Sequence, residues 1–199
     1  MPLNPTETLE SEHRFIQKVV AAAAVLADRL AAGIDLDIDV LHGIVEFMRT
    51  YADKCHHDKE EALLFPALER RGVPMSGCPI GALLREHEIG RTVVGGLGEA
   101  TDAYGKGNAE AKDALIKSLR GLVELYPNHI WKEDFLLFPM TNKVLSPADL
   151  ESLRIEFEKV EENFGKGVRH QFERFAEELA LKQQSDRERW QPKLPQNQT

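Results

Sequence analysis

Two short stretches of this sequence place ionisable side chains directly before a strongly apolar segment. "HHDKEEALLFP" (residues 56–66) and "HIWKEDFLLFP" (residues 129–139) share the order His, two residues, Lys, Glu, an acid, one residue, Leu-Leu-Phe-Pro. Neutral imidazoles and ionised carboxylates are the groups that bind divalent and trivalent cations. The chemistry that these residue types perform at this spacing is therefore metal binding.

The repeat extends beyond these two stretches. "EHRFI" (residues 12–16) and "EHEIG" (residues 86–90) each begin with Glu-His and precede the two motifs at nearly the same distance. Each half of the repeat thus has one histidine on a first helix and a His-x-x-x-Glu on a second. Residues i and i+4 lie on one helix face, so the imidazole and the carboxylate can both point inward. We expect six side chains in the core: His13, His56, Glu60, His87, His129 and Glu133.

Burial of these groups needs compensation. An isolated buried charge costs at least several kcal/mol, against a total stability of roughly 5–15 kcal/mol. One inward histidine is usually a hydrogen-bonded core residue, but a solvated face has no reason to duplicate the whole set in register. Four histidines and two carboxylates without a thiolate suit iron, manganese or zinc. One carboxylate from each half is well placed to bridge two ions.

The elements that position these residues are predicted to be helices. Apolar residues recur at helical spacing over about 8–32, from about 40 to 72, from 79 to about 105 and over 109–140. "SPAD" (residues 146–149) starts a fifth, highly charged helical region that reaches about 183, with a break at residues 165–167.

The predicted fold is therefore all-α, an antiparallel up-down four-helix bundle with an internal hairpin repeat and a C-terminal helical extension. The bundle is expected over residues 1–145 and the extension over 146–184. A flexible polar tail is expected over 185–199.

Composition excludes several classes of protein. The chain has 199 residues and a net charge of −8, which argues against a nucleic-acid partner and an anionic membrane surface. No apolar run reaches the roughly 20 residues of a membrane span, and "MPLNPTETLESEH" lacks the regions of a signal peptide. The two cysteines, Cys55 and Cys78, form no CxxC pattern. We expect a cytoplasmic protein with free thiols.

The order of these motifs resembles the hemerythrin-like, HHE cation-binding family over about residues 8–142. The resemblance implies a four-helix bundle that holds two iron ions, bridged by two carboxylates and a solvent-derived oxygen. Zinc or manganese could take the place of iron. The six residues named above match the family's ligand positions, and Glu60 and Glu133 match its bridging carboxylates.

The sequence departs from the oxygen-carrying hemerythrins on its third helix. Those proteins have a second histidine one turn after the third-helix ligand, and Arg91 stands there in this chain. A guanidinium is no metal ligand. One iron is therefore expected to lack a ligand, to keep an open or water-filled position, or to recruit a neighbour. His57 and Glu86 are the candidates.

The last carboxylate has two candidates. Oxygen carriers use the acid five residues after the fourth-helix histidine, which is Asp134 here. The i+4 spacing and the match to Glu60 favour Glu133, which leaves Glu61 and Asp134 to surround the ligands or face solvent. Tyr126 lies one turn before the fourth-helix histidine, where it could hydrogen-bond into the site or pack in the core.

Three functions are compatible with such a site. The leading hypothesis is a di-iron protein that binds or senses a small molecule such as dioxygen or a related oxidant. The second is an oxidoreductase acting on peroxide, nitric oxide or dioxygen, in which Arg91 could stabilise an anionic intermediate. The third is iron sensing or storage. The sequence assigns no protein partner, and leaves open whether the protein is an enzyme.

Overall fold

The protein is helical throughout its described part. The computed structural model describes residues 3–189, in which every regular element is a helix. None of these helices is long and apolar enough to cross a membrane. The all-α class predicted from the sequence is thus confirmed.

Four long helical segments carry the repeat. The first is α1 (Pro5–Ala31), and the third is α4 (Ile80–Gly105). The second and fourth are composite. The second runs through α2 (Ile38–Glu46), the π-helical η1 (Phe47–His57) and η2 (Glu60–Leu64), and α3 (Phe65–Arg70). The fourth runs through α5 (Ala111–Lys132), the π-helical η3 (Glu133–Leu137) and α6 (Phe138–Val144).

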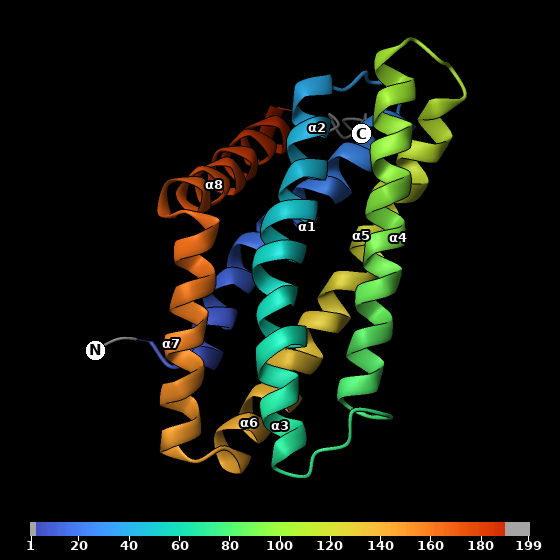
Figure 1. The fold of residues 1–199 in the computed structure, drawn as a ribbon. Helices are drawn as coiled ribbons and strands as arrows, with labels where there is room; N and C mark the ends of the chain where they lie inside the picture. Colours follow the sequence, from blue (N-terminus) through green and yellow to red (C-terminus); the bar gives the residue numbers. More distant parts are fainter. Residues whose placement is uncertain (1–2, 190–199) are drawn as a thin grey trace, which may run out of the picture.

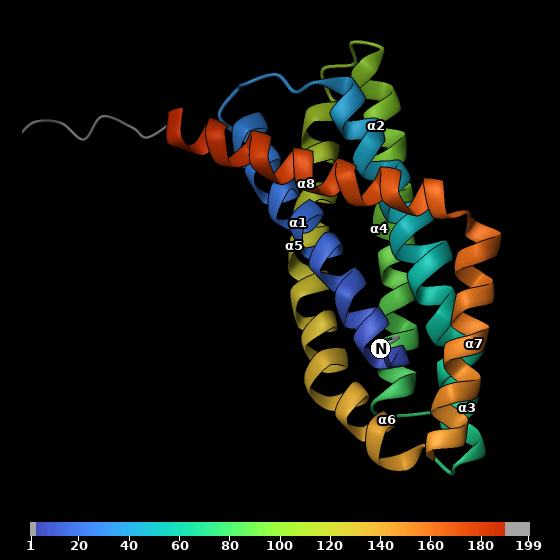
Figure 2. The same cartoon turned by 90° about the vertical axis from the view of Figure 1, so that its left-hand side faces the viewer.

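The extension consists of α7 (Pro147–Phe164) and α8 (Lys166–Arg189). The four long segments lie lengthwise beside one another, α7 lies along the α3 end of the second segment, and α8 crosses α1 (Figures 1 and 2). Gly165, with φ of 92°, separates α7 from α8 and confirms the predicted break. The helix continues to Arg189, into the expected tail, and residues 190–199 lie outside the described part.

The sequence signals for helix starts act as expected. The side chains of Ser146 and Asp149 form a reciprocal capping box at the start of α7, with Pro147 in the first turn. The α1 helix begins three residues earlier than predicted. The Asn4 side chain accepts a hydrogen bond from the Thr6 backbone N–H there, and so satisfies one of the unpaired donors of the first turn.

Short π-helical turns interrupt both motifs, where the sequence pattern had indicated continuous α-helix. The Phe65 N–H donates to the carbonyl of Glu60, five residues back, and the Phe138 N–H donates in the same way to Glu133. Pro66 and Pro139 follow directly. Proline lacks an N–H and its ring clashes with the carbonyl four residues earlier, and a wider turn is one way a helix absorbs that defect.

The core is divided into two apolar clusters. One surrounds Ile16, Tyr51 and Leu122, and the other surrounds Leu9 and Phe65. The ionisable residues of the repeat fall between these clusters along every long segment. Both sides of this polar layer are therefore shielded from water.

Candidate metal centre

The structure brings the predicted residues together in two groups. In each group one candidate ligand atom from every residue lies within 4.8 Å of all the others. The first group is His13, His56, Glu60 and Glu133. The second is His57, His87 and His129. All seven residues are at most 3% exposed. The six residues expected from the repeat are all present, and His57 joins them.

The two glutamates lie between the groups. Glu133 places Oε2 3.1 Å from Nε2 of His13, and Oε1 3.2 Å from Nε2 of His129. Glu60 places Oε2 3.8 Å from Nε2 of His56 and 3.5 Å from Nε2 of His87. Each carboxylate thus faces imidazoles of both groups, which is the arrangement a bridging ligand needs. Asp134 lies outside this set.

Every one of the five histidines directs Nδ1 at a carboxylate. The pairs, with their distances, are His13–Asp134 (2.6 Å), His56–Glu12 (3.0 Å), His57–Asp53 (3.2 Å), His87–Glu61 (2.6 Å) and His129–Glu86 (3.0 Å). A carboxylate that accepts the Nδ1 proton fixes the tautomer and leaves the Nε2 lone pair free. Metal-binding histidines are held in this way.

The inward atoms lack partners of their own. Within the described residues no hydrogen bond reaches Nε2 of His57, His87 or His129. The same holds for the carboxylate oxygens of Glu60 and Glu133, whose approach to the imidazoles does not have hydrogen-bond geometry. Unsatisfied buried polar atoms are rare and cost about 1–3 kcal/mol each. Their concentration at one point is what a cation would remedy.

Two of the imidazoles face each other directly. Nε2 of His13 lies 3.0 Å from Nε2 of His56. When both Nδ1 atoms donate to carboxylates, both Nε2 atoms carry lone pairs. These repel each other unless a proton or a cation lies between them. The donor set therefore fits a metal ion.

Burial and neighbouring charges set the protonation of the metal-free cluster. Burial lowers the pKa of His56 and of His57 well below the ordinary value, which keeps them in the neutral, ligating form. Burial acts in the same direction on His13, but its hydrogen bond with Asp134 and the nearby carboxylate of Glu133 outweigh burial and raise the pKa to about 9. Metal binding would displace that proton.

The two glutamates titrate as a pair. Burial, and then the charge of Glu133, raise the pKa of Glu60 well above its ordinary value. Burial acts to raise the pKa of Glu133 as well, but the neighbouring His129, His13 and His87 lower it well below the ordinary value. Without a metal the pair thus holds one proton, as expected for two carboxylates in a dry site.

In each half of the repeat, a lysine donates a hydrogen bond to the glutamate that holds the His56 or His129 imidazole. Lys59 donates to Glu12, and Lys132 donates to Glu86. The first pair is completely buried, and Glu161 of α7 accepts a further bond from Lys59 at 3.0 Å. The second pair is partly exposed, with 25% of the Lys132 side chain and 18% of the Glu86 side chain accessible. The extension therefore covers one half of the repeat.

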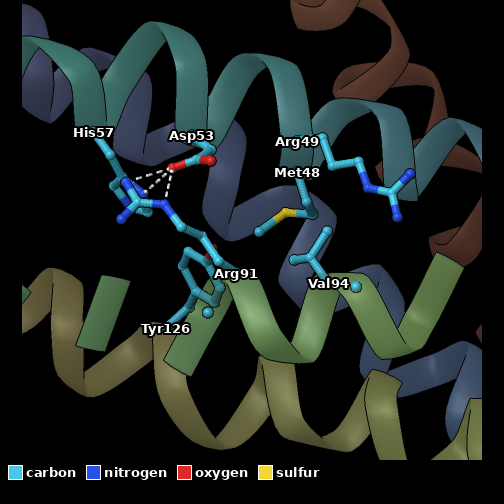
Figure 3. A pocket seen from close by; sticks show the side chains of 9 residues that line it. Met48, Arg49, Asp53, His57, Arg91, Val94 and Tyr126 are labelled. Atoms are coloured by element: carbon cyan, nitrogen blue, oxygen red, sulfur yellow. Dashed lines mark hydrogen bonds and ion pairs between the residues drawn. The ribbon is translucent and has the colours of Figure 1, made fainter. Parts of the chain in front are cut away.

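Arg91 takes a different place from the one expected. Its guanidinium donates to Asp53 at 2.9 Å, as Figure 3 shows, and also to Glu61 (2.7 Å) and Glu88 (2.6 Å). It braces two acids that hold histidines, and it does not face the converging ligand atoms. The expectation that it would stabilise an anionic intermediate at the metals thus finds no support in the geometry.

Of the two alternatives for Tyr126, the structure shows core packing, and Glu86 differs from the expectation. The Tyr126 side chain is buried in the apolar cluster around Ile16, and its hydroxyl makes no hydrogen bond within residues 3–189. Its ring stacks on His57 at a centroid distance of 6.5 Å. Glu86 accepts from Nδ1 of His129 and so lies behind a ligand position.

Sequence reasoning missed Glu12 and Asp53. Glu12 immediately precedes His13, as Glu86 precedes His87, so the repeat itself could have identified it. Asp53 lies four residues before His57, on the same helix face. The role of Asp53 follows only once His57 is known to point inward.

Comparisons with known proteins agree with this site. Residues 4–141 match the family model described as the hemerythrin HHE cation-binding domain. Three uncharacterized mycobacterial proteins, Mb2018 of Mycobacterium bovis and MT2051 and Rv1995 of Mycobacterium tuberculosis, are each 25% identical over 162 residues. The aligned region is 81% of this chain and 62% of each relative, so the chain spans less than two thirds of their length. No solved structure matches the chain significantly. The family match covers most of the chain and contains every residue of both ligand groups, and the protein therefore belongs to the hemerythrin HHE cation-binding family.

Proposed function

We propose that this protein holds a non-haem di-iron centre and uses it to bind or sense dioxygen or a related small oxidant. The observation that carries the proposal is the convergence of four imidazole Nε2 atoms on two buried carboxylates, with His57 grouped beside two of these imidazoles and each of the five imidazoles oriented by its own acid. This set of nitrogen and oxygen donors suits iron, and zinc or manganese are the alternatives.

The ligands divide naturally between two ions. His13 and His56 would hold one ion, and the second group would hold the other, with Glu60 and Glu133 bridging. His57 would supply the nitrogen that Arg91 does not. When bound, iron ions would supply redox chemistry and take up the small oxidant. The chain itself keeps the imidazoles in one tautomer and excludes water.

The surrounding architecture fits this proposal. Four long segments with short connections suit the antiparallel up-down order that the hairpin repeat implies. The ligand positions all fall within residues 1–145, which we propose as the metal-binding unit, with α7 and α8 as a helical extension.

Metal analysis tests the proposal. We expect two irons per chain in protein purified without chelators, with near-ultraviolet absorption that changes when the reduced protein meets air. His129→Ala should lower the metal content, because it removes one nitrogen donor. His42→Ala is the matched control, since His42 is 53% exposed and pairs with Asp102 away from the site.

The outcomes separate the hypotheses. Reversible spectral changes support binding or sensing, and consumption of peroxide or nitric oxide would indicate an oxidoreductase. A protein whose stability follows iron supply, without either response, would indicate iron sensing or storage. Full metal retention in His129→Ala, or no metal after anaerobic reconstitution, would refute the proposed centre.

A further inference from the structure

A small pocket opens beside the second ligand group. It has a volume of about 90 Å³, and its lining includes Arg49, Asp53, His57, Gly90, Arg91, Gly95 and Tyr126, with the Asp53 carboxylate paired to Arg91 (Figure 3). About 10–15 Å³ of such volume suffices for one water molecule. The pocket therefore has room for a ligand of a few heavy atoms.

The inner wall of the pocket is formed by two buried rings, those of His57 and Tyr126. His57 is 2% exposed and Tyr126 is 3% exposed. Nε2 of His57 belongs to the proposed metal centre, whereas the Tyr126 side chain makes ring contacts with His57 and His129 and no hydrogen bond within the described part of the chain. A tyrosine hydroxyl is protonated at neutral pH and can donate one hydrogen bond. A buried donor without a partner favours a ligand that brings an acceptor.

The two arginines that line the pocket differ in their ion pairs. Arg91 is tied to three acids and forms a fixed wall. Arg49 is exposed and makes no ion pair with any residue in 3–189. In Figure 3 its guanidinium lies apart from Asp53 and Arg91, at the opposite side of the pocket. An unpaired cation beside a pocket raises the local concentration of anions and their association rate.

Two glycines of α4 leave the pocket open. A Cβ at Gly90 would lie 3.3 Å from the Tyr126 hydroxyl oxygen, which is a crowded contact. A Cβ at Gly95 would meet nothing within 4 Å, so a side chain there would extend into free space. The opening therefore depends on the absence of side chains at these two positions.

We propose that this pocket admits and recognises small anions with hydrogen-bond acceptor atoms on their way to the His57 side of the metal centre, with Arg49 attracting them and the Tyr126 hydroxyl receiving them. This inference rests on the proposed function and names the ligand class of that site. It assigns to Arg49, Gly95 and Tyr126 roles in ligand entry that are separate from holding the metal.

A substitution that fills the pocket tests whether ligands reach the metal centre through it. Gly95→Leu fills it, and Gly96→Leu is the matched control, because Gly96 neighbours Gly95 on the same helix but lines none of this pocket. Both replace a helical glycine and change helix propensity equally.

Stopped-flow mixing of the iron-loaded protein with azide, which is an anion, or with nitric oxide, which is neutral, gives the association rates. Gly95→Leu should slow both by about tenfold or more, a change set by lost access. Gly96→Leu should leave both unchanged. Wild-type rates in Gly95→Leu would overturn the route.

Two further variants test recognition of the anion. Arg49→Gln should slow azide association by about fivefold at low salt and flatten its salt dependence, while nitric oxide association stays the same. Tyr126→Phe keeps the ring and should weaken azide affinity by about tenfold, the loss expected for one hydrogen bond to a charged acceptor. Equal effects on azide and nitric oxide would overturn the anion preference.

The test separates this inference from the proposed function. Iron content is measured for each variant, so loss of metal is not mistaken for loss of entry. If the protein takes up no iron, the proposed function fails, and crystals of metal-free protein soaked in bromide still report on the pocket. An anomalous peak about 3.3 Å from the Tyr126 oxygen supports an anion site there. Bromide bound only elsewhere, or an adventitious ion only, overturns it.

Discussion

Replacement of Lys59 by methionine isolates the effect of the helical extension on the site. Lys59 donates to Glu12 and to Glu161, and both members of the Lys59–Glu12 pair are completely buried. Methionine keeps most of the side-chain volume but removes the charge. Glu12 would then retain Arg169, at 3.6 Å, as its remaining cation. Removing one member of a buried pair costs about 3–5 kcal/mol, and the residual contact with Arg169 places the expected loss near 3 kcal/mol.

The repeat supplies its own control in Lys132→Met. Lys132 occupies the equivalent position and makes the equivalent bond to Glu86, but 25% of its side chain is exposed. Water can solvate the remaining carboxylate there, and exposed pairs are worth about 0–1 kcal/mol. We therefore expect Lys59→Met to be about 2 kcal/mol more destabilising than Lys132→Met.

Urea unfolding of the metal-free protein, followed by circular dichroism in the presence of a chelator, measures the difference. Metal must be absent because a bound ion adds its own stabilisation by linkage. The slope of the unfolding free energy against urea should stay the same in all three proteins, so that midpoints report stability. If the two substitutions lower the free energy of unfolding equally, burial of Lys59 by α7 does not explain the larger loss expected for Lys59→Met.

Three other expectations concern separate parts of the molecule. Glu61→Gln and Asp134→Asn each remove the acid behind one histidine, and each should weaken metal binding by about 10–100-fold in a chelator competition, whereas unchanged affinity would contradict the orienting role. Hydrogen bonds from Arg71 and Ser146 hold the pKa of Asp149 below its ordinary 3.8, so its stabilisation is complete above that pH and is lost as the pH falls. The stability difference between wild type and Asp149→Asn should thus be constant at neutral pH and shrink in acid unfolding below about pH 4, and a constant difference would contradict this. Burial raises the pKa of Cys55 to about 12, and Cys78 is exposed, so a thiol reagent should modify one cysteine quickly in the native protein and both in urea.

Most of the ligand groups could be predicted from the sequence, because their residues lie close together in each motif and the motif occurs twice. His56 with Glu60, and His129 with Glu133, are joined by i,i+4 spacing, which any regular helix turns toward one side. The duplication then indicated that the matching residues of both halves share one environment. Both inferences needed only the order of residues along the chain.

The sequence could not decide whether His57 points into the core, because the direction of its side chain depends on the local winding of the helix. On an ideal α-helix neighbouring residues point about 100° apart, so His56 and His57 are not expected to face the core together. The η1 segment is π-helical up to His57, and both imidazoles are buried. The widened turn is a response to the tertiary structure and has no simple sequence signal.

The partners of Lys59 were hidden for another reason. The contact between Lys59 and Glu161 joins residues 102 positions apart in the chain. The repeat predicts equal surroundings for Lys59 and Lys132, and nothing in either motif distinguishes them. The difference comes from where α7 packs, which no local pattern reports.

Because the helical extension covers only one half of the repeat, the two halves are not equivalent. Two identical half-sites would bind ions in random order, because neither has any advantage over the other. The helical extension encloses Glu12 and Lys59 in protein, while Glu86 and Lys132 stay in contact with water. In the proposed two-ion centre, ions and protons would therefore reach the two halves unequally, and a centre that held one ion would have one preferred vacancy.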